Sequence, residues 1–201
     1  MSHTKEFWEA VTTHLELSGL ALGIALLLCV PLGVFTSRWG GWARLVINAV
    51  GVARVVPSIA VLFLLLPYLG LGFAPALVAL TLLACPPILI NTDAGMRGVD
   101  PAVIEAGRGL GMGPVRLVRE VQLPIALPVV VAGVRTSAVE VIASATLATL
   151  IGGGALGDFI IRGLDEGRYE ILMVGAVPVA LIAVTAEVLL GTLQRNLSRG
   201  V

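Results

Sequence analysis

The chain has 201 residues, of which 57% are hydrophobic and only 13% are charged, and its formal net charge at pH 7 is zero. Its mean hydropathy is +0.99. A soluble domain carries about a quarter of its residues as charges, so this composition excludes an ordinary water-soluble domain and indicates an integral membrane protein.

Five apolar stretches are long enough to cross a bilayer, which takes roughly 20 mostly apolar residues. They cover about residues 17–35, 45–66, 73–90, 127–151 and 171–190. We expect helices, because an open strand cannot satisfy its backbone hydrogen bonds in lipid. The second and fourth stretches are the least regular, so either can be kinked or partly broken. We therefore predict an all-α, polytopic membrane protein with a single transmembrane domain over residues 1–201.

Basic residues in the connecting segments predict the orientation. The connecting segments that lie on one side of the membrane hold eight arginines, namely Arg38, Arg44, Arg97, Arg108, Arg116, Arg119, Arg195 and Arg199. The segments on the other side hold only three basic residues, Lys5, Arg162 and Arg168. We therefore place the N-terminus outside, and the C-terminus and the loop at 91–126 in the cytoplasm. The first apolar run is not preceded by the basic region of a signal peptide, so we expect it to stay in the membrane.

The cytoplasmic loop carries signals for two short helices. Asp100 can cap a helix and Pro101 is favoured at the first helical position. Four glycines between Gly107 and Gly113 then end this helix and permit a tight turn, and Pro114 begins the second helix. One interpretation is an ordinary surface loop with amphipathic helices against lipid headgroups.

The order and spacing of residues in this loop resemble the EAA loop of ABC-importer permeases, E-A-A-x3-G-x9-I-x-L-P. The matching positions are Glu105, Ala106, Gly107, Gly111, Leu123 and Pro124, with glycine at the third-position alanine. The resemblance implies the five-span fold of methionine-importer-like permeases, with a cytoplasmic coupling helix that docks on a partner ATPase. Glu105 would lie at that contact, and Gly111 would allow close backbone approach.

Further matches resemble the osmoprotectant branch of this family, which imports glycine betaine, carnitine and choline. They lie at residues 91–92, 98–101, 132–136 and 145–148, while residues 151–158 fit this branch and the methionine-importer permeases alike. The resemblance implies a permease for a compatible solute, with a methionine-type importer as the alternative. An ion-coupled secondary transporter and a membrane scaffold are alternatives from other classes.

The chain has no G-x-x-x-x-G-K-[ST] phosphate loop, so we expect a transporter subunit rather than an enzyme, with ATP and Mg bound by a partner. Cys29 and Cys85 lack metal or disulfide spacing, and we expect no metal or cofactor. The resemblance implies a cytoplasmic ABC ATPase dimer, a second permease subunit, identical or sister, and an extracytoplasmic substrate-binding protein. Membrane lipid is a further partner, nucleic acid is not, and the location is the bacterial inner membrane.

Four ionisable residues fall within the predicted spans, namely Arg54, Arg135, Glu140 and Glu187. Such groups are costly at membrane depth and are functional by default. We interpret Arg54, Arg135 and Glu187 as candidates for intramembrane ion pairs. For Glu140 two interpretations stay open. Its carboxylate lines the pathway and attracts a cationic substrate, or it pairs with an arginine and holds the bundle together.

Polar and small residues near the span ends are further candidates for the pathway or its gate. Asn91 and Thr92 can satisfy carbonyls that the proline pair of the third span frees, or they line the pathway wall. Gly152, Gly153 and Gly154 allow close packing on the outer side. The resemblance places this glycine run before a short outer helix, at about residues 158–164, near the extracytoplasmic gate. The alternative is a plain turn.

Overall fold

The computed structural model describes residues 2–38 and 40–199, and all regular structure within these ranges is helical. The all-α prediction is confirmed. Four of the helical segments are long and apolar enough to cross a membrane. Three are the helices α1 (Ser2–Thr36), α4 (Phe73–Arg97) and α9 (Tyr169–Arg199). The fourth contains α7 (Leu123–Ser144) and runs on through the 3-10 helix η2 (Ala145–Ile151).

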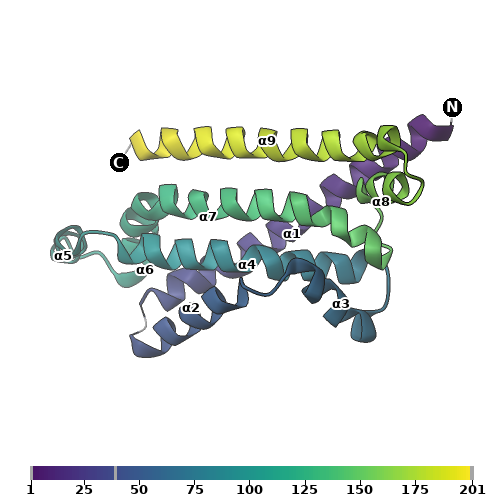
Figure 1. Ribbon diagram of the computed structural model, residues 1–201. Coiled ribbons are helices and arrows are strands. Elements are labelled where there is room, and N and C mark those ends of the chain that lie inside the picture. Colours follow the sequence, from purple (N-terminus) through teal and green to yellow (C-terminus); the bar gives the residue numbers. More distant parts are fainter. Residues whose placement is uncertain (1, 39, 200–201) are drawn as a thin grey trace.

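The long helices pack side by side, with α4 and α7 central, α1 against α4, and α9 against α7 (Figure 1). The contact between α1 and α4 uses one face of each helix. Buried residues recur at every fourth position, as Leu17, Ala21, Ala25, Cys29 and Gly33 in α1 and as Ala76, Leu80, Ala84, Ile88 and Thr92 in α4. Rows at this spacing interlock between helices, and the small side chains let the backbones approach closely.

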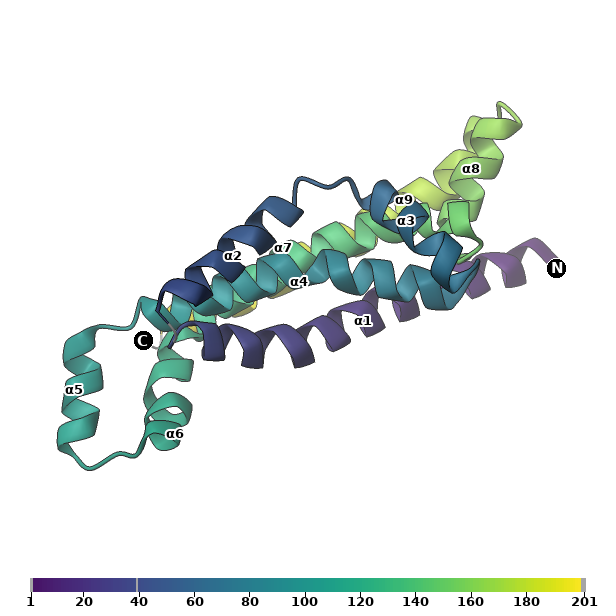
Figure 2. The same cartoon turned by 90° about the horizontal axis from the view of Figure 1, so that it is seen from below.

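The expected second span, 45–66, is not one continuous helix. The structure has α2 (Gly41–Ala53) and α3 (Ser58–Leu69), with residues 54–57 between them. Pro57 lacks the backbone N–H that a helix interior needs for its hydrogen bonds. Its ψ of 137° is extended rather than helical, so the helix is interrupted here. The two helices together run from the α5 end of the bundle to the α8 end, and they diverge from α4 on one side (Figures 1 and 2).

The helix α1 extends beyond the expected first span, 17–35, because it begins at Ser2. The helices α4 and α9 likewise extend past the expected ends of the third and fifth spans, residues 90 and 190, to Arg97 and Arg199. Charged and polar residues stop hydropathy from marking these ends, although they do not break a helix. Two short helices, α5 (Pro101–Gly109) and α6 (Pro114–Leu117), project beyond one end of the bundle, where the C-terminal end of α9 also lies (Figure 2). The short helix α8 (Gly157–Asp165) and the N-terminal end of α1 lie at the other end.

Close backbone approach joins α4 to α7. A Cβ atom at Gly133 would lie 2.6 Å from the carbonyl oxygen of Pro87 and 2.7 Å from Cβ of Asn91. One turn away, the buried Ser137 hydroxyl donates a hydrogen bond of 2.7 Å to the carbonyl oxygen of Ala84. Because glycine at 133 and a short hydroxyl at 137 face α4, the two helices contact each other through their backbones.

Candidate functional site

The projecting segment is built by local signals in its sequence. The Asp100 side chain caps α5 by accepting a hydrogen bond of 2.8 Å from the amide of Ala102, as the D-P pair predicted. After α5 the chain turns at Gly111, whose φ of +76° favours glycine. Glu105 and Ala106 are exposed on α5. Both are therefore accessible to another protein.

Gly107 is buried where α5 lies against α6, and its lack of a side chain leaves room for the contact. A Cβ atom at this position would be 2.5 Å from Cδ1 of Leu117 and 3.6 Å from Sδ of Met112. The amide of Met112 donates to the carbonyl oxygen of Gly107 at 3.1 Å. Alanine at this position would require the Leu117 side chain to move, so glycine lets α5 and α6 lie close together in this chain.

The second half of this segment is continuous with the bundle. The helix α6 passes through the π-helical turn η1 (Val118–Gln122) into α7. Leu123 and Pro124 begin α7 directly after this turn. No loop therefore separates α6 from α7.

Sequence reasoning missed the polar cluster that fixes this end of the bundle. The carboxylate of Asp93, which is 6% exposed, accepts hydrogen bonds from Thr36 at 2.9 Å and from Nε of Arg97 at 2.8 Å. Arg97 also donates to the carbonyl oxygen of Thr36 at 2.7 Å. Nearby, Arg38 donates to the carbonyl oxygen of Pro114 at 3.1 Å. An acid just after an apolar run, with an arginine four residues later, was the available signal.

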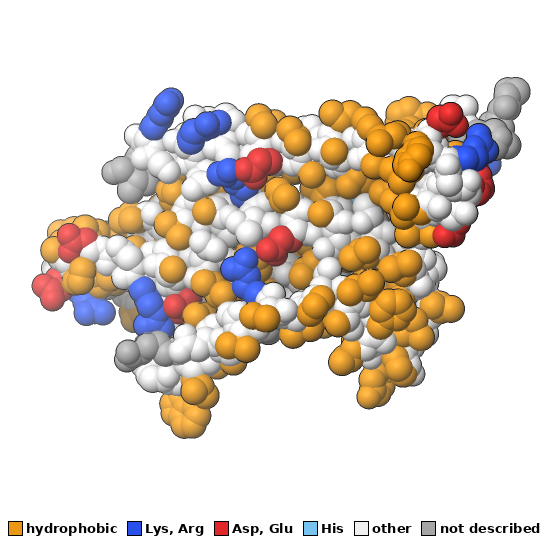
Figure 3. All heavy atoms as spheres, viewed as in Figure 1, with side chains coloured by type: hydrophobic (Ala, Val, Ile, Leu, Met, Phe, Trp, Pro, Cys, Tyr) orange, Lys and Arg blue, Asp and Glu red, His pale blue; other side chains and the backbone are white. Residues whose placement is uncertain are grey.

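Arg54 and Glu140 meet where the second span is broken. Nη2 of Arg54 lies 3.3 Å from Oε1 of Glu140, and the two side chains are 42% and 37% exposed. They line a cavity of about 700 Å³ whose other walls are largely apolar and come from α1, α2, α3 and α4. Figure 3 shows one face of the molecule, on which acidic and basic side chains lie side by side amid hydrophobic ones.

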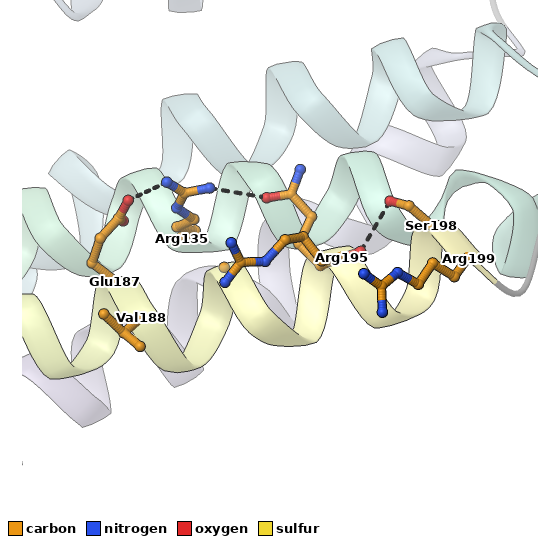
Figure 4. Close-up of a pocket in the computed structure, with 8 residues that line it drawn as sticks. Arg135, Glu187, Val188, Arg195, Ser198 and Arg199 are labelled. Atoms are coloured by element: carbon orange, nitrogen blue, oxygen red, sulfur yellow. Dashed lines mark hydrogen bonds and ion pairs between the residues drawn. The ribbon is translucent and has the colours of Figure 1, made fainter.

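Arg135 and Glu187 form a second ion pair, between α7 and α9. Arg135 also donates to Oε1 of Gln194 at 3.3 Å. Both residues line a pocket of about 410 Å³, and Figure 4 shows Arg135 reaching from α7 across to α9. Arg195 and Arg199 line the same pocket, nearer the C-terminal end of α9.

Asn91 and Thr92 do not line the cavity at Arg54 and Glu140. The Asn91 amide donates to the carbonyl oxygen of Pro87 at 2.8 Å, and the buried Thr92 hydroxyl donates to that of Ile88 at 2.7 Å. Both bonds lie within α4. A Cβ atom at Gly33 of α1 would come 2.6 Å from Cβ of Thr92. These side chains thus pack in the interfaces of α4 with α7 and α1.

The glycine run forms a compact turn at the α8 end. Gly152 and Gly154 have φ of +72° and +70°, and Ala155 has +92°. Gly153 is buried, and a Cβ atom there would lie 2.9 Å from the carbonyl oxygen of Ala148. The turn is tied to the start of α4 because the amide of Gly72 donates to the carbonyl oxygen of Ile151 at 2.7 Å. It lies apart from the cavity at Arg54 and Glu140.

Within residues 2–38 and 40–199, no group of three or more His, Cys, Asp or Glu side chains is arranged to hold a metal ion.

An ion pair joins α8 to α1 at the same end of the bundle as the glycine turn. Arg162 of α8 donates a hydrogen bond of 2.7 Å to Glu6 of α1, and this bond raises the pKa of the Arg162 guanidinium group.

Residues 29–201 match the family described as the binding-protein-dependent transport system inner membrane component. A carnitine transport permease protein of Listeria monocytogenes is 46% identical over 92% of this chain and 84% of its own length. A choline transport system permease protein of Bacillus subtilis is 43% identical, over 92% and 85%. An osmoprotectant import permease protein of Salmonella typhimurium is 37% identical, over 90% and 86%.

Solved structures share the fold. The inward-facing methionine ABC transporter contains a chain that superposes with a TM-score of 0.86 at 21% identity and covers 98% of both chains. A chain of an amino acid ABC transporter with histidines gives 0.78 at 22% identity, over 97% and 95%. The chain therefore belongs to the family of binding-protein-dependent transport system inner membrane components, and it is a transport permease subunit rather than an enzyme.

Proposed function

We propose that this chain is the membrane-spanning subunit of an ATP-driven importer for compatible solutes that carry a quaternary ammonium group, namely glycine betaine, carnitine and choline. The observation that carries the proposal is the 40–46% identity, over 92% of the chain, to permeases named for these three solutes. The methionine-type alternative is supported by structures at 21–22% identity. Such a likeness indicates the fold and leaves the substrate open.

In this role the chain crosses the membrane five times, with α2 and α3 together forming the second crossing. The N-terminus is outside, and the C-terminus and the α5–α6 segment are cytoplasmic. The arginines near the C-terminal end of α9 and in α5 and α6 support this orientation, because basic residues favour the cytoplasmic side.

The α5–α6 segment is the coupling element, and it docks on a cytoplasmic ABC ATPase dimer that binds ATP and Mg. Exposure of Glu105 and Ala106 supports this role. Closure of the ATPases displaces α6, and the continuous helix from α6 into α7 carries that displacement to Arg135 and Glu140. This chain needs no cofactor for the task, because its part is mechanical.

A second permease subunit, identical or sister, completes the pathway, and an extracytoplasmic binding protein delivers the substrate. The break in the second span supports a second subunit. Val55 lies in the break and is 80% exposed, yet irregular backbone at membrane depth must be covered by protein or line a water-filled cavity. The low aromatic content, 5%, supports specificity in a separate binding protein, because aromatic cages are the usual quaternary ammonium sites. The turn at Gly152–Gly154 would lie near the outer gate.

Uptake measurements test the proposal. The chain is expressed with its ATPase and binding protein in a strain that lacks osmoprotectant import, and uptake of labelled glycine betaine, carnitine and choline is followed. We expect uptake that unlabelled quaternary amines inhibit and methionine does not. Inhibition by methionine alone indicates the methionine-type importer. Uptake that survives inactivation of the ATPase phosphate loop indicates an ion-coupled transporter.

A further inference from the structure

We propose that Arg54 and Glu140 form an exchangeable ion pair that receives a zwitterionic substrate. The quaternary ammonium group of the substrate lies against Glu140, and its carboxylate lies against Arg54. This inference rests on the proposed function, because it requires that quaternary amines cross this chain. It adds the residues that distinguish zwitterions, such as glycine betaine and carnitine, from the cation choline.

The pair lies where the backbone of the second span is interrupted. Arg54 follows the last residue of α2, and the chain is irregular up to Pro57. In secondary transporters an interrupted span is a good indicator of the binding site, and irregular backbone at membrane depth is tolerated where it lines a water-filled cavity. A substrate that moves through such a cavity can reach both side chains of the pair.

The cavity has the chemistry that a quaternary ammonium zwitterion needs. Its volume is about 700 Å³, and among the described residues that line it only Arg54 and Glu140 are charged. Apolar side chains such as Val61, Leu64 and Leu82 form much of the rest. A quaternary nitrogen has no N–H to donate, so it is held by apolar contact with its methyl groups and by Coulomb attraction to an anion. Glu140 supplies that anion.

The pair is weakly held, so its partners can exchange. Within the described residues, Arg54 and Glu140 have only each other as side-chain partners, through one contact of 3.3 Å. Both side chains are more than a third exposed, and water that enters the cavity weakens an ion pair of this kind. In the second pair of the bundle, Arg135 is additionally held by Gln194. The Arg54–Glu140 pair is therefore the easier of the two to open.

Charge balance makes the exchange selective. A zwitterion offers Arg54 a carboxylate and Glu140 a cation, so each charge keeps an opposite partner when the pair opens. Choline offers only a cation, so Arg54 would be left without an anion. Unpaired charge is costly at membrane depth. In this chain the pair therefore favours zwitterions over choline during passage.

Three variants of the complete transporter test the inference: Arg54→Gln, the double variant Arg54→Gln/Glu140→Gln, and Arg162→Gln as the control. Initial uptake rates of glycine betaine and choline are measured at saturating substrate, each relative to wild type. We expect Arg54→Gln to lower glycine betaine uptake at least about tenfold more than choline uptake, as loss of a hydrogen bond to a charged group implies. Arg162 is in a pair of similar exposure, 44% and 41%, far from the cavity, so its replacement should leave the ratio unchanged.

The double variant separates transport from folding. It leaves no charge in the cavity, and its two amides can bond to each other, so it should assemble even if Arg54→Gln does not. A purely structural pair predicts normal uptake of both substrates by this variant. The inference predicts slow uptake of both, because the ammonium group has lost Glu140. Normal uptake by the double variant, or equal effects of Arg54→Gln on both substrates, overturns the inference. If the wild type imports no quaternary amine, the proposed function itself fails, and the inference with it.

Discussion

Replacing Gly133 with alanine probes the close contact between α4 and α7. The added Cβ atom would lie 2.6 Å from the carbonyl oxygen of Pro87, whereas a comfortable C···O contact is about 3.3 Å. The helices must therefore separate locally by about 0.7 Å, and the hydrogen bond from Ser137 to Ala84, one turn away, must lengthen or bend.

The expected loss of stability follows from this overlap. Overpacking of a tight interior by one methyl group costs about 1–3 kcal/mol. For a chain of this size, about 2–4 °C of melting temperature corresponds to each kcal/mol. Gly133→Ala should therefore melt about 2–12 °C below the wild type.

A thiol-reactive dye can report the unfolding in detergent, because Cys29 is only 3% exposed in the folded chain. Gly23→Ala is the matched control, since a Cβ atom there meets nothing within 4 Å. Alanine favours a helix over glycine by about 1 kcal/mol, so this control should melt at or slightly above the wild-type temperature. Equal melting temperatures for Gly133→Ala and Gly23→Ala would refute the close-contact argument.

Two further predictions concern the end of the bundle that carries α5 and α6. Gly111→Ala places a side chain at φ +76°, which costs about 1–2 kcal/mol, so ATP-dependent uptake should fall. The control Gly109→Ala, at an open helical position, should leave uptake unchanged. Equal uptake rates for the two variants would show that the turn tolerates alanine. Asp93→Asn removes the charge that accepts from Arg97 and Thr36 and should cost about 1.5–3 kcal/mol in the dye assay. Thr36→Val removes one neutral donor and should cost less, and the opposite order would contradict a charge-centred cluster.

Local patterns predicted much of this protein. Hydropathy located the long helices, because the energy of placing a segment in lipid is a sum over its own residues. Asp100 and Pro101 predicted the start of α5, because a cap bonds to an amide two residues away. The irregular second stretch indicated that this span could break, although the extent of the break, residues 54–57, came from the structure.

The pairing of distant charges could not be predicted in this way. Arg54 bonds to a residue 86 positions away, and Arg135 bonds to one 52 positions away. Four charges within the spans allowed several pairings, and the crossing of α7 with its neighbours selects among them. Asn91 and Thr92, which were candidates for the pathway, form hydrogen bonds within α4. The Asn91 amide and the Thr92 hydroxyl reach carbonyl oxygens one turn back in their own helix more easily than they reach a cavity.

The sequence by itself determined that this chain is an all-helical membrane protein and where its exposed α5–α6 segment begins and turns. These properties depend on composition and on neighbours within a few residues. Only the tertiary structure decided that Gly107 packs on Leu117, that α6 continues into α7, and that Arg54 faces Glu140 in a common cavity. Each of those contacts depends on the relative positions of packed helices, which are set by the shapes of whole helix faces and not by any single segment.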